Sequence, residues 1–480
     1  MMLGFNFFTT ARWKDGTPFL LFCALLFAWG GVLFGIDTGS FGSIQALAPW
    51  LKVFGTRSVD GDYALSTSRQ AVMNGIELTA HEWVQFSVGR IIAYLAVGLV
   101  ENAVPSYSAE IAPSSLRGAF SGSLMCIVTL GNIWGAGMGR AMASYTNNAG
   151  WLIPVGVQLI PAAILLIGLP FTVESPRWLL EQGKNELALR NLNRLRPSGQ
   201  VEDRSTEAEL DVMSCTRGSD FAGADGSWLE IFRGNYRRRV IIASLLFWFQ
   251  QTTGGQFVVS YAPTFFRDMG LGNRSFTYSL LTQVAGFVGA LISCLVTDRV
   301  GRRPLLISGM FLATFFNFLI AGLGSKADIS TAETNMVIAS LILLSASIKY
   351  SASTLAYLIA AEIGGTRMRK KTIAVATAVD VIAAIVITIS IPYLLGTPGA
   401  NLKAGVGWVL GGNSGLALLF AIFFVPELKG RSLDEVDELF EANLWAWQFK
   451  DYRTSTSLGQ TASHSVKTVE TKVIEDKTDI

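Results

Sequence analysis

The chain has 480 residues, of which 50% are hydrophobic and 15% charged, and its formal net charge is +2. Soluble domains carry about a quarter of charged residues, so this composition excludes an ordinary soluble enzyme. The nearly balanced charge provides no basic face for nucleic acid, and we expect no such partner.

Ten apolar runs follow one another along the chain, and most approach or reach the ~20 residues with which a helix crosses a bilayer. In chain order the predicted spans are Phe19–Ile36, Val88–Val100, Leu124–Met138, Leu152–Val173, Val240–Phe249, Tyr278–Val296, Leu305–Leu323, Met336–Ile348, Ile373–Leu395 and Val406–Val425. This pattern predicts an all-α polytopic protein surrounded by a lipid bilayer, and it excludes a single-pass receptor.

Lysine and arginine are concentrated in alternate loops between the predicted spans, and such loops stay in the cytosol. With cytosolic N- and C-termini, Arg117, the Arg237–Arg239 run and the Arg299–Arg303 turn all lie inside. We therefore expect an N-terminal half with about four spans at 1–173, a cytosolic connector at 174–239, a C-terminal half with six spans at 240–426, and a cytosolic tail at 427–480 that is disordered toward its end.

Two sequence landmarks recur at a constant offset. Glu110 precedes Arg117 by seven residues, and Glu362 precedes Arg369 by seven. A second acid follows each pair at nearly the same distance. Glu174 lies 64 residues after Glu110, and Glu427 lies 65 residues after Glu362. Because both landmarks recur at nearly the same offset, they indicate an internal duplication.

The duplication also shows that the first half is shorter than the second. The first half has four predicted spans and the second has six, and a whole pair of spans can be absent without reversing the orientation of later loops. We expect the missing pair to belong between about Ala71 and Val84, which gives about ten spans in all.

Two charges lie within or beside the first two spans. Asp37 ends the first predicted span and Arg90 begins the second. A charge within a span costs roughly 2.5–3.5 kcal/mol on insertion scales and usually has a partner. One interpretation pairs Asp37 with Arg90 and lets a proton break the pair. The other places both at the external interface.

Polar residues interrupt two spans of the second half. Gln250 and Gln251 are followed by a glycine pair, then Gln256 and Tyr261, while Asp380 sits in the middle of its span. Amides donate and accept hydrogen bonds as sugar hydroxyls do, and unwound backbone is tolerated in a membrane where it lines a cavity. The alternatives are interhelical packing for the amides and a protonated packing residue for Asp380.

Acids and bases also recur on the predicted cytosolic face. Salt bridges that form in one conformer and break in another would make an inner gate there, whereas positive-inside charge and helix capping explain the bases alone. The candidate gate residues are Glu110, Arg117, Glu174, Arg177, Asp298, Arg299, Arg302, Arg303, Glu362, Arg369 and Glu427.

Four cysteines and two histidines are scattered along the chain. Cys23, Cys126 and Cys294 lie inside apolar runs, and Cys215 lies in the connector. The spacing matches neither a disulfide framework nor a metal site, so we expect no metal and no cofactor.

Several of these motifs resemble signatures of the sugar porter family of the major facilitator superfamily. They are Tyr107-x-x-Glu110-Ile111-Ala112-Pro113, Glu174-Ser175-Pro176-Arg177, Gln250-Gln251-x-x-Gly254, Asp298-Arg299-x-Gly301-Arg302-Arg303-Pro304 and Pro426-Glu427-x-Lys429-Gly430. The resemblance covers about Gly16 to Lys450. It implies two pseudo-symmetric helical halves, twelve spans in the complete family pattern, and transport of a sugar by alternating access in the plasma membrane by a monomer.

The resemblance also implies roles for individual residues. Asp37 and Arg90 match a pair implicated in proton coupling, which would make the chain a symporter of a monosaccharide or related sugar. The matching substrate contacts are Gln250, Gln251, Gln256 and Asn132, to which we add Tyr261 and Asp380. The pair of spans that the chain lacks corresponds to the second and third helices of the family.

The chain also departs from the family pattern in its later spans. The usual Trp-Gly-Pro stretch aligns with Ala352-Ser353-Thr354, which predicts the loss of a ring and of a helix break. Two alternatives to transport therefore stay open: a transporter-like sugar sensor, and a non-transporting paralogue or mis-assembled gene.

Overall fold

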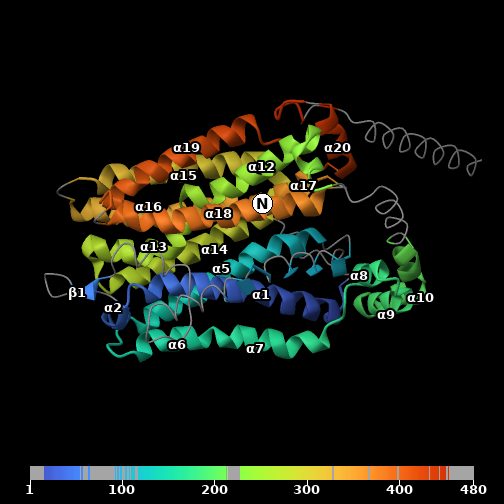
Figure 1. The fold of residues 1–480 in the computed structure, drawn as a ribbon, viewed down its shortest axis with the longest axis horizontal. Coiled ribbons are helices and arrows are strands. Elements are labelled where there is room, and N and C mark those ends of the chain that lie inside the picture. Colours follow the sequence, from blue (N-terminus) through green and yellow to red (C-terminus); the bar gives the residue numbers. More distant parts are fainter. Residues whose placement is uncertain are drawn as a thin grey trace, which may run out of the picture.

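The computed structural model forms a bundle of long helices that run alongside one another (Figure 1). It describes residues 16–54, 56–57, 63–64, scattered positions between 92 and 108, 110–113, 117–211, 213, 227–326, 329–365, 368–396, 399–431, 433–442, 444–449 and 452. Seven helical segments in these residues are long and apolar enough to cross a membrane: Pro18–Ile44, Ala149–Phe171, Arg274–Thr297, Arg302–Gly324, Thr331–Ile363, Arg369–Leu395 and Lys403–Phe423.

Two further rods run with these seven. One is α5 (Arg117–Met142), and the other joins α12 (Gly234–Gln250), the π-helical turn η5 (Gln251–Gly255) and α13 (Gln256–Phe266). Nine of the ten predicted spans are therefore long helices in the described residues. The predicted span 88–100 is described only at scattered helical positions, and the predicted place of the missing pair, 71–84, lies outside the described residues.

The two ends of the bundle carry different short elements (Figure 1). At the end that we call the connector end lie α8 (Pro176–Glu181), α9 (Asn185–Leu195), α10 (Ser198–Glu202) and α20 (Leu433–Glu441). At the opposite end, the hairpin end, α2 (Ala48–Phe54) leads into an antiparallel pair of β1 (Thr56–Arg57) and β2 (Tyr63–Ala64), with Thr56 opposite Ala64.

The first helix, α1 (Pro18–Ile44), is longer than the sequence predicted. It begins at the connector end, where the Thr17 side chain accepts a hydrogen bond from the Leu20 amide and donates to the Leu195 carbonyl of α9. It continues eight residues beyond the expected end at Ile36. Asp37 therefore lies inside the helix and is only 5% exposed.

Small residues let α1 pack closely against α5 along this extension. A Cβ atom added at Gly39 would lie 2.6 Å from the Asn132 carbonyl oxygen, and one at Gly42 would lie 2.7 Å from the Val259 carbonyl oxygen of α13. Only glycine allows so close an approach of backbones. The same extension therefore brings α1 against helices of both halves.

Helices α6 (Ala149–Val157) and α7 (Leu159–Gly168), with the 3-10 turn η3 (Leu169–Phe171), complete the first half before the connector. After the connector, the short turn η4 (Glu230–Phe232) precedes α12. The second half continues with α14 (Arg274–Val300), α15 (Arg302–Gly324), α16 (Thr331–Ile348), α17 (Thr354–Ile363), α18 (Arg369–Leu395) and α19 (Val406–Phe423), and includes the short turns η6 (Arg267–Leu271) and η8 (Lys403–Gly405).

Helices α16 and α17 are joined by a π-helical turn, η7 (Lys349–Ser353), and together they form one continuous helical segment, Thr331–Ile363. The hydroxyl of Thr354 donates to the Lys349 carbonyl oxygen at 2.7 Å. This bond ties the Thr354 side chain back to the first residue of the π-helical turn. The irregularity therefore persists although the glycine and proline of the family pattern are absent.

The two halves meet along two helix pairs, since α1 packs against α13 and α5 packs against α14. Apolar side chains on the outer helices remain exposed, as Leu166 (71%) and Ile382 (55%) illustrate. Such exposure is expected where lipid rather than water surrounds the protein. The described start of the tail is helical, and α20 buries Leu439 and Phe440.

Candidate functional site

The candidate site lies at the kink in the rod α12–η5–α13. Gly254 has a φ of +115°, a conformation that favours glycine, and the rod departs there from regular helix. Next to this kink, the Gln251 amide nitrogen donates to both carboxylate oxygens of Asp380, each at 3.0 Å. Asp380 belongs to α18 and is 7% exposed. Two residues predicted separately from the sequence are thus in direct contact.

Lys349 adds a cation to this pair from a third element, the turn η7. It interacts electrostatically with Asp380. Its aliphatic chain packs beside α14, where the missing side chain of Gly286 leaves room. Because a charge inside a membrane usually has a partner, the pairing explains how both residues are tolerated there. We call Gln251, Lys349 and Asp380 the polar midsection.

Gln256 and Tyr261 lie beyond the kink, five residues apart on α13. The Gln256 amide donates to the hydroxyls of Ser260 and Thr388 at 3.1 and 3.3 Å. The Tyr261 hydroxyl donates to the Thr388 carbonyl oxygen at 2.8 Å, and its side chain is fully buried. Both residues therefore attach α13 to α18 beside the polar midsection.

Three buried polar atoms of the same rod have no hydrogen-bond partner among the described residues: Gln250 Oε1, Thr252 Oγ1 and Thr253 Oγ1. Gln250 is 7% exposed. Most buried polar groups in proteins are hydrogen-bonded, so unpartnered ones call for an explanation. Hydroxyls of a ligand would supply the missing donors and acceptors.

Sequence reasoning missed two amides, of which Asn317 is buried and Gln158 is half-buried. Asn317 of α15 donates to the Thr253 carbonyl oxygen at 3.0 Å and to the Ser414 hydroxyl at 3.1 Å. Gln158, between α6 and α7, donates to the Ser40 hydroxyl at 2.8 Å. Both are single amides inside apolar runs, the same signal that drew attention to Asp380. Among the described residues, no group of three His, Cys, Asp or Glu side chains could hold a metal ion.

In the first half, Asn132 of α5 accepts a hydrogen bond from the Thr38 hydroxyl of α1 at 2.8 Å. It is 2% exposed, and its backbone lies close to Gly39 of α1. Asp37 is the neighbour of Thr38 in the sequence. Arg90 lies outside the described residues, so the Asp37–Arg90 pair stays a prediction.

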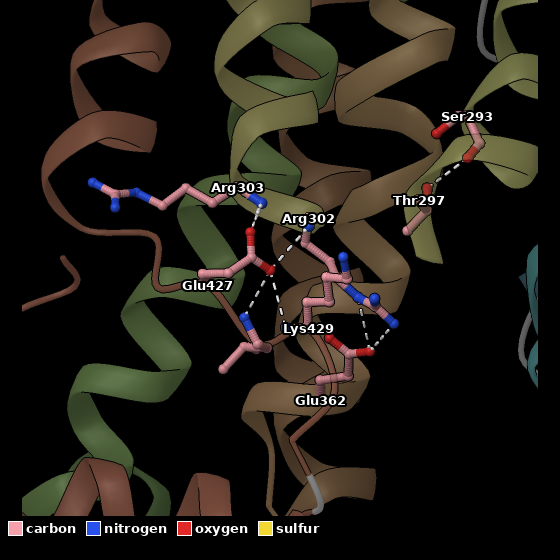
Figure 2. A network of polar contacts seen from close by, with 8 residues as sticks. Ser293, Thr297, Arg302, Arg303, Glu362, Glu427 and Lys429 are labelled. Atoms are coloured by element: carbon pink, nitrogen blue, oxygen red, sulfur yellow. Dashed lines mark hydrogen bonds and ion pairs between the residues drawn. The ribbon is translucent and has the colours of Figure 1, made fainter. Parts of the chain in front are cut away.

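Acids and bases meet at the connector end (Figure 2). Arg302 forms a salt bridge with Glu362 of α17 at 2.9 Å. Glu427 accepts hydrogen bonds from the backbone amides of Arg302 and Arg303, both at 3.1 Å, and so caps the N-terminus of α15. At Gly301 a Cβ atom would lie 2.5 Å from a Glu427 carboxylate oxygen. Only glycine fits this position, because its φ is +106° and because the carboxylate leaves no room for a Cβ atom.

The other predicted gate residues fall at the same end with different contacts. The Lys429 ammonium donates to the Arg299 carbonyl oxygen, and the Asn191 amide donates to that of Glu174. Arg177 lies in α8, Arg369 begins α18, and Glu110 is half-buried. The side chains of Arg117 and Asp298 lie outside what the structure describes.

Contacts at the hairpin end were not predicted. The Arg267 guanidinium donates to the Ala46 carbonyl oxygen at 2.6 Å, and that of Arg140 donates to the Thr277 hydroxyl at 2.7 Å. A buried cluster beside them contains Phe41, Trp50, Trp151 and Phe276. Because Arg267, Thr277 and Phe276 belong to the second half, these contacts join the two halves at this end.

The long apolar helices and the buried polar midsection are those of a multi-pass membrane protein. Residues 70–440 match the family described as sugar (and other) transporter. The match covers more than half of the chain, and the chain belongs to this family.

Among curated proteins the chain is similar to yeast and fungal transporters. It is 26% identical to the low-affinity glucose transporter HXT4 of Saccharomyces cerevisiae, over 89% of this chain and 81% of the relative. It is 27% identical to the general alpha-glucoside permease of the same yeast, over 87% and 74%. The major facilitator-type transporter ecdD of Aspergillus rugulosus is 26% identical, over 86% of each chain.

Solved structures with the same fold include the xylose transporter XylE from Escherichia coli. Its partially occluded inward-open conformation matches with a TM-score of 0.68 at 20% identity, over 87% of this chain and 100% of that chain. The proton:xylose symporter XylE bound to 6-bromo-6-deoxy-D-glucose matches with a TM-score of 0.68 at 22% identity, over 88% and 99%.

Proposed function

We propose that the protein carries a sugar across the membrane by alternating access, with the sugar bound beside the polar midsection. The observation that carries this proposal is the buried side-chain oxygen of Gln250, Oε1, which has no hydrogen-bond partner among the described residues and belongs to the neighbour of Gln251 in the Gln251–Asp380 contact. Gln250, Gln251, Gln256, Tyr261, Asp380 and Asn132 are the proposed substrate contacts. A polyol has hydroxyls to fill such a set of amide and carboxylate groups without carrying charge.

The proposed cycle uses the contacts at the two ends of the bundle in turn. At the hairpin end, Arg267 and Arg140 bridge the halves. At the connector end, the predicted gate residues surround the Arg302–Glu362 bridge. Opening of one end while the other stays closed would expose the midsection to one side of the membrane at a time.

We also propose that uptake is coupled to protons. Asp37 is a buried acid inside α1, beside the Thr38–Asn132 contact that joins the two helices. Pairing with Arg90 would hold it charged, and protonation would release the pair. A change of this kind would alter the packing of α1, which also packs against α13 of the second half.

The proposed orientation places the connector end and both termini in the cytosol, in the plasma membrane, with the chain acting as a monomer. The proposed division of the chain stays 1–173, 174–239, 240–426 and 427–480. Arginines near the connector end, including Arg237, Arg299 and Arg303, support this orientation through the positive-inside rule.

The proposal is tested by uptake measurements in a host without its own sugar transporters. Labelled hexoses, pentoses, disaccharides and polyols are offered separately to cells that express the full chain. Saturable uptake of at least one sugar is expected, and unlabelled excess of that sugar should suppress it. If no sugar is taken up or bound by the purified protein in lipid vesicles, the proposed function is wrong.

A non-transporting paralogue is the second candidate. The alignment with HXT4 extends over 475 positions, but it contains only 89% of the 480 residues of this chain. The remaining aligned positions hold residues of the relative that have no counterpart here. The shorter first half that the sequence indicates is consistent with this difference. Binding of a sugar without uptake would favour this candidate.

A further inference from the structure

The fold brings together two cysteines that the sequence leaves 168 positions apart. Cys126 lies on α5 and Cys294 on α14, and their sulfur atoms are 3.5 Å apart. Both side chains are half-buried. The two helices run side by side and belong to different halves of the molecule (Figure 1). The pair is therefore a contact between halves and is separate from the residues of the polar midsection.

The position of the pair along the two helices is informative. Cys126 is nine residues from the start of α5 and Cys294 is six residues from the end of α14, or about 14 and 9 Å at 1.5 Å per residue. Both thus lie toward the connector end. The Arg140–Thr277 hydrogen bond joins the same two helices at the hairpin end.

We propose that Cys126 and Cys294 form an oxidisable dithiol whose disulfide fastens the two halves together and stops transport. The effect on transport rests on the alternating access proposed above. Formation of the disulfide itself rests only on the distance between the two sulfur atoms.

Hydrogen peroxide or another two-electron peroxide is the proposed oxidant. One thiolate attacks a peroxide oxygen, the O–O bond breaks, and the cysteine becomes a sulfenic acid while one water is released after proton transfer. The second thiolate then attacks the sulfenic sulfur, and a second water leaves. In total, two thiols and one hydrogen peroxide give one disulfide and two waters, and a dithiol reductant reverses the change.

The geometry requires only a small adjustment. A disulfide has an S–S length of about 2.05 Å, so the sulfur atoms must approach by about 1.5 Å. Once formed, the bond keeps the two Cα atoms within about 7 Å of each other. In the proposed cycle the two halves separate when the connector end opens, and α5 and α14 belong to different halves. The disulfide would therefore hold this end closed.

The disulfide is measured by counting free thiols on the full chain in lipid vesicles. After peroxide treatment and denaturation, a maleimide coupled to polyethylene glycol shifts the protein on a gel once per free thiol. The parent has four cysteines and should fall from four to two. Cys126→Ser and Cys294→Ser should each stay at three. Cys23→Ser, a matched control at a buried cysteine away from the pair, should fall from three to one.

Transport is measured on the same vesicles. Peroxide should reduce sugar uptake of the parent and of Cys23→Ser by at least tenfold, and dithiothreitol should restore it. Cys126→Ser and Cys294→Ser should keep their uptake. An unchanged count of four thiols in the parent, or loss of two thiols in Cys126→Ser, would overturn the proposed pair.

The two parts of the proposal can fail separately. Complete formation of the disulfide with unchanged uptake would overturn the proposed effect on transport, while the Cys126–Cys294 disulfide itself would stand. If the parent takes up no sugar at all, the proposed function fails, but the thiol count still decides the pair. Hydrogen–deuterium exchange then measures whether the disulfide holds the two halves together, because oxidation should slow the exchange of backbone amides at the connector ends of α5 and α14. Unchanged exchange would overturn it.

Discussion

Opposite charges in the polar midsection stabilise each other because both are removed from water. Lys349 and Asp380 interact electrostatically, and the Gln251 amide donates hydrogen bonds to the carboxylate. Removal of one partner from such a pair leaves an uncompensated charge, whereas removal of both leaves none. The three residues are therefore coupled, and their substitutions should not be additive.

Lys349→Met should lower the melting temperature of the purified protein by several degrees, because Asp380 loses its cation. The double variant Lys349→Met with Asp380→Asn should recover most of the loss. Thermal unfolding in detergent, followed for parent, both single variants and the double variant, measures the coupling. Losses that simply add in the double variant would contradict the pairing.

Gln251→Ala should weaken sugar binding more than it lowers the amount of protein at the surface. A hydroxyl left without a partner in a closed site costs about 1–3 kcal/mol, which is roughly 5–150-fold in affinity. The concentration dependence of uptake measures this change. Gln182→Ala, an exposed amide of the connector, is the matched control and should keep the parent affinity. Equal affinities for both variants would remove Gln251 from the site.

Asp37→Asn should abolish accumulation of sugar against its gradient while downhill exchange continues. Asparagine has a similar shape but cannot take up and release the proton. Uptake is compared with exchange of labelled for unlabelled sugar in preloaded vesicles, with and without a proton gradient. Uptake by the parent that does not respond to the proton gradient would contradict proton coupling.

At the scale of the elements, irregular turns place the site. The kink at Gly254 and the π-helical turn η7 interrupt two long rods beside α18, and each carries a residue of the polar midsection. At the connector end, Gly301 allows the turn between α14 and α15 and makes room for Glu427. Local backbone geometry thus determines both the site and the capped turn.

Gly301→Ala should destabilise the protein by more than the strain of its backbone alone. A Cβ atom there would lie 2.5 Å from Glu427, whereas at Gly183 (φ +74°) it would meet nothing within 4 Å. Gly183→Ala is the control for a glycine of positive φ without a clash, where left-handed strain costs about 1–2 kcal/mol. The backbone of Gly301 (φ +106°, ψ +167°) lies in a region almost confined to glycine, so the difference in melting temperature measures this extra strain together with the clash with Glu427. Equal losses would mean that Glu427 moves aside freely.

The sequence predicted the existence and order of most helices, because uninterrupted apolar runs of span length have few other interpretations. It predicted the end of α1 wrongly, since the packing of Gly39 and Gly42 against other helices is not visible in composition. It identified Gln251 and Asp380 as unusual but not as partners. The contacts of Asn317 and Cys126 depend on helices far apart in the sequence, and only the folded chain shows them.

At the scale of the whole molecule, the orientation of the bundle determines which end faces the cell exterior. Asn273-Arg274-Ser275 is an acceptor sequence for N-glycosylation at the hairpin end, and Asn273 is exposed. With the connector end in the cytosol, expression in a glycosylating host should add a glycan there, and Asn273→Gln should remove it. Protease cleavage of the tail near Ser457 from the outside of intact cells would contradict this orientation.

The shorter first half leads to the last prediction, that the chain transports poorly as it stands. Helix packing is the main force that holds a bundle together in lipid. Two fewer helices remove part of that packing from the first half. The first half would also lack a counterpart to the Asp298–Arg303 turn at the connector end.

The test inserts the second and third helices of a relative after Gln70. Uptake per folded molecule should rise at least tenfold and the melting temperature should increase, because both packing and the connector-end turn are restored. An apolar helical hairpin of equal length but unrelated sequence, inserted at the same place, is the control and should leave uptake unchanged. Equal uptake by the parent and the chain with the relative's helices would show that the bundle of about ten spans is a complete transporter. In that case the contacts of α1 and α5 with the second half are sufficient for alternating access.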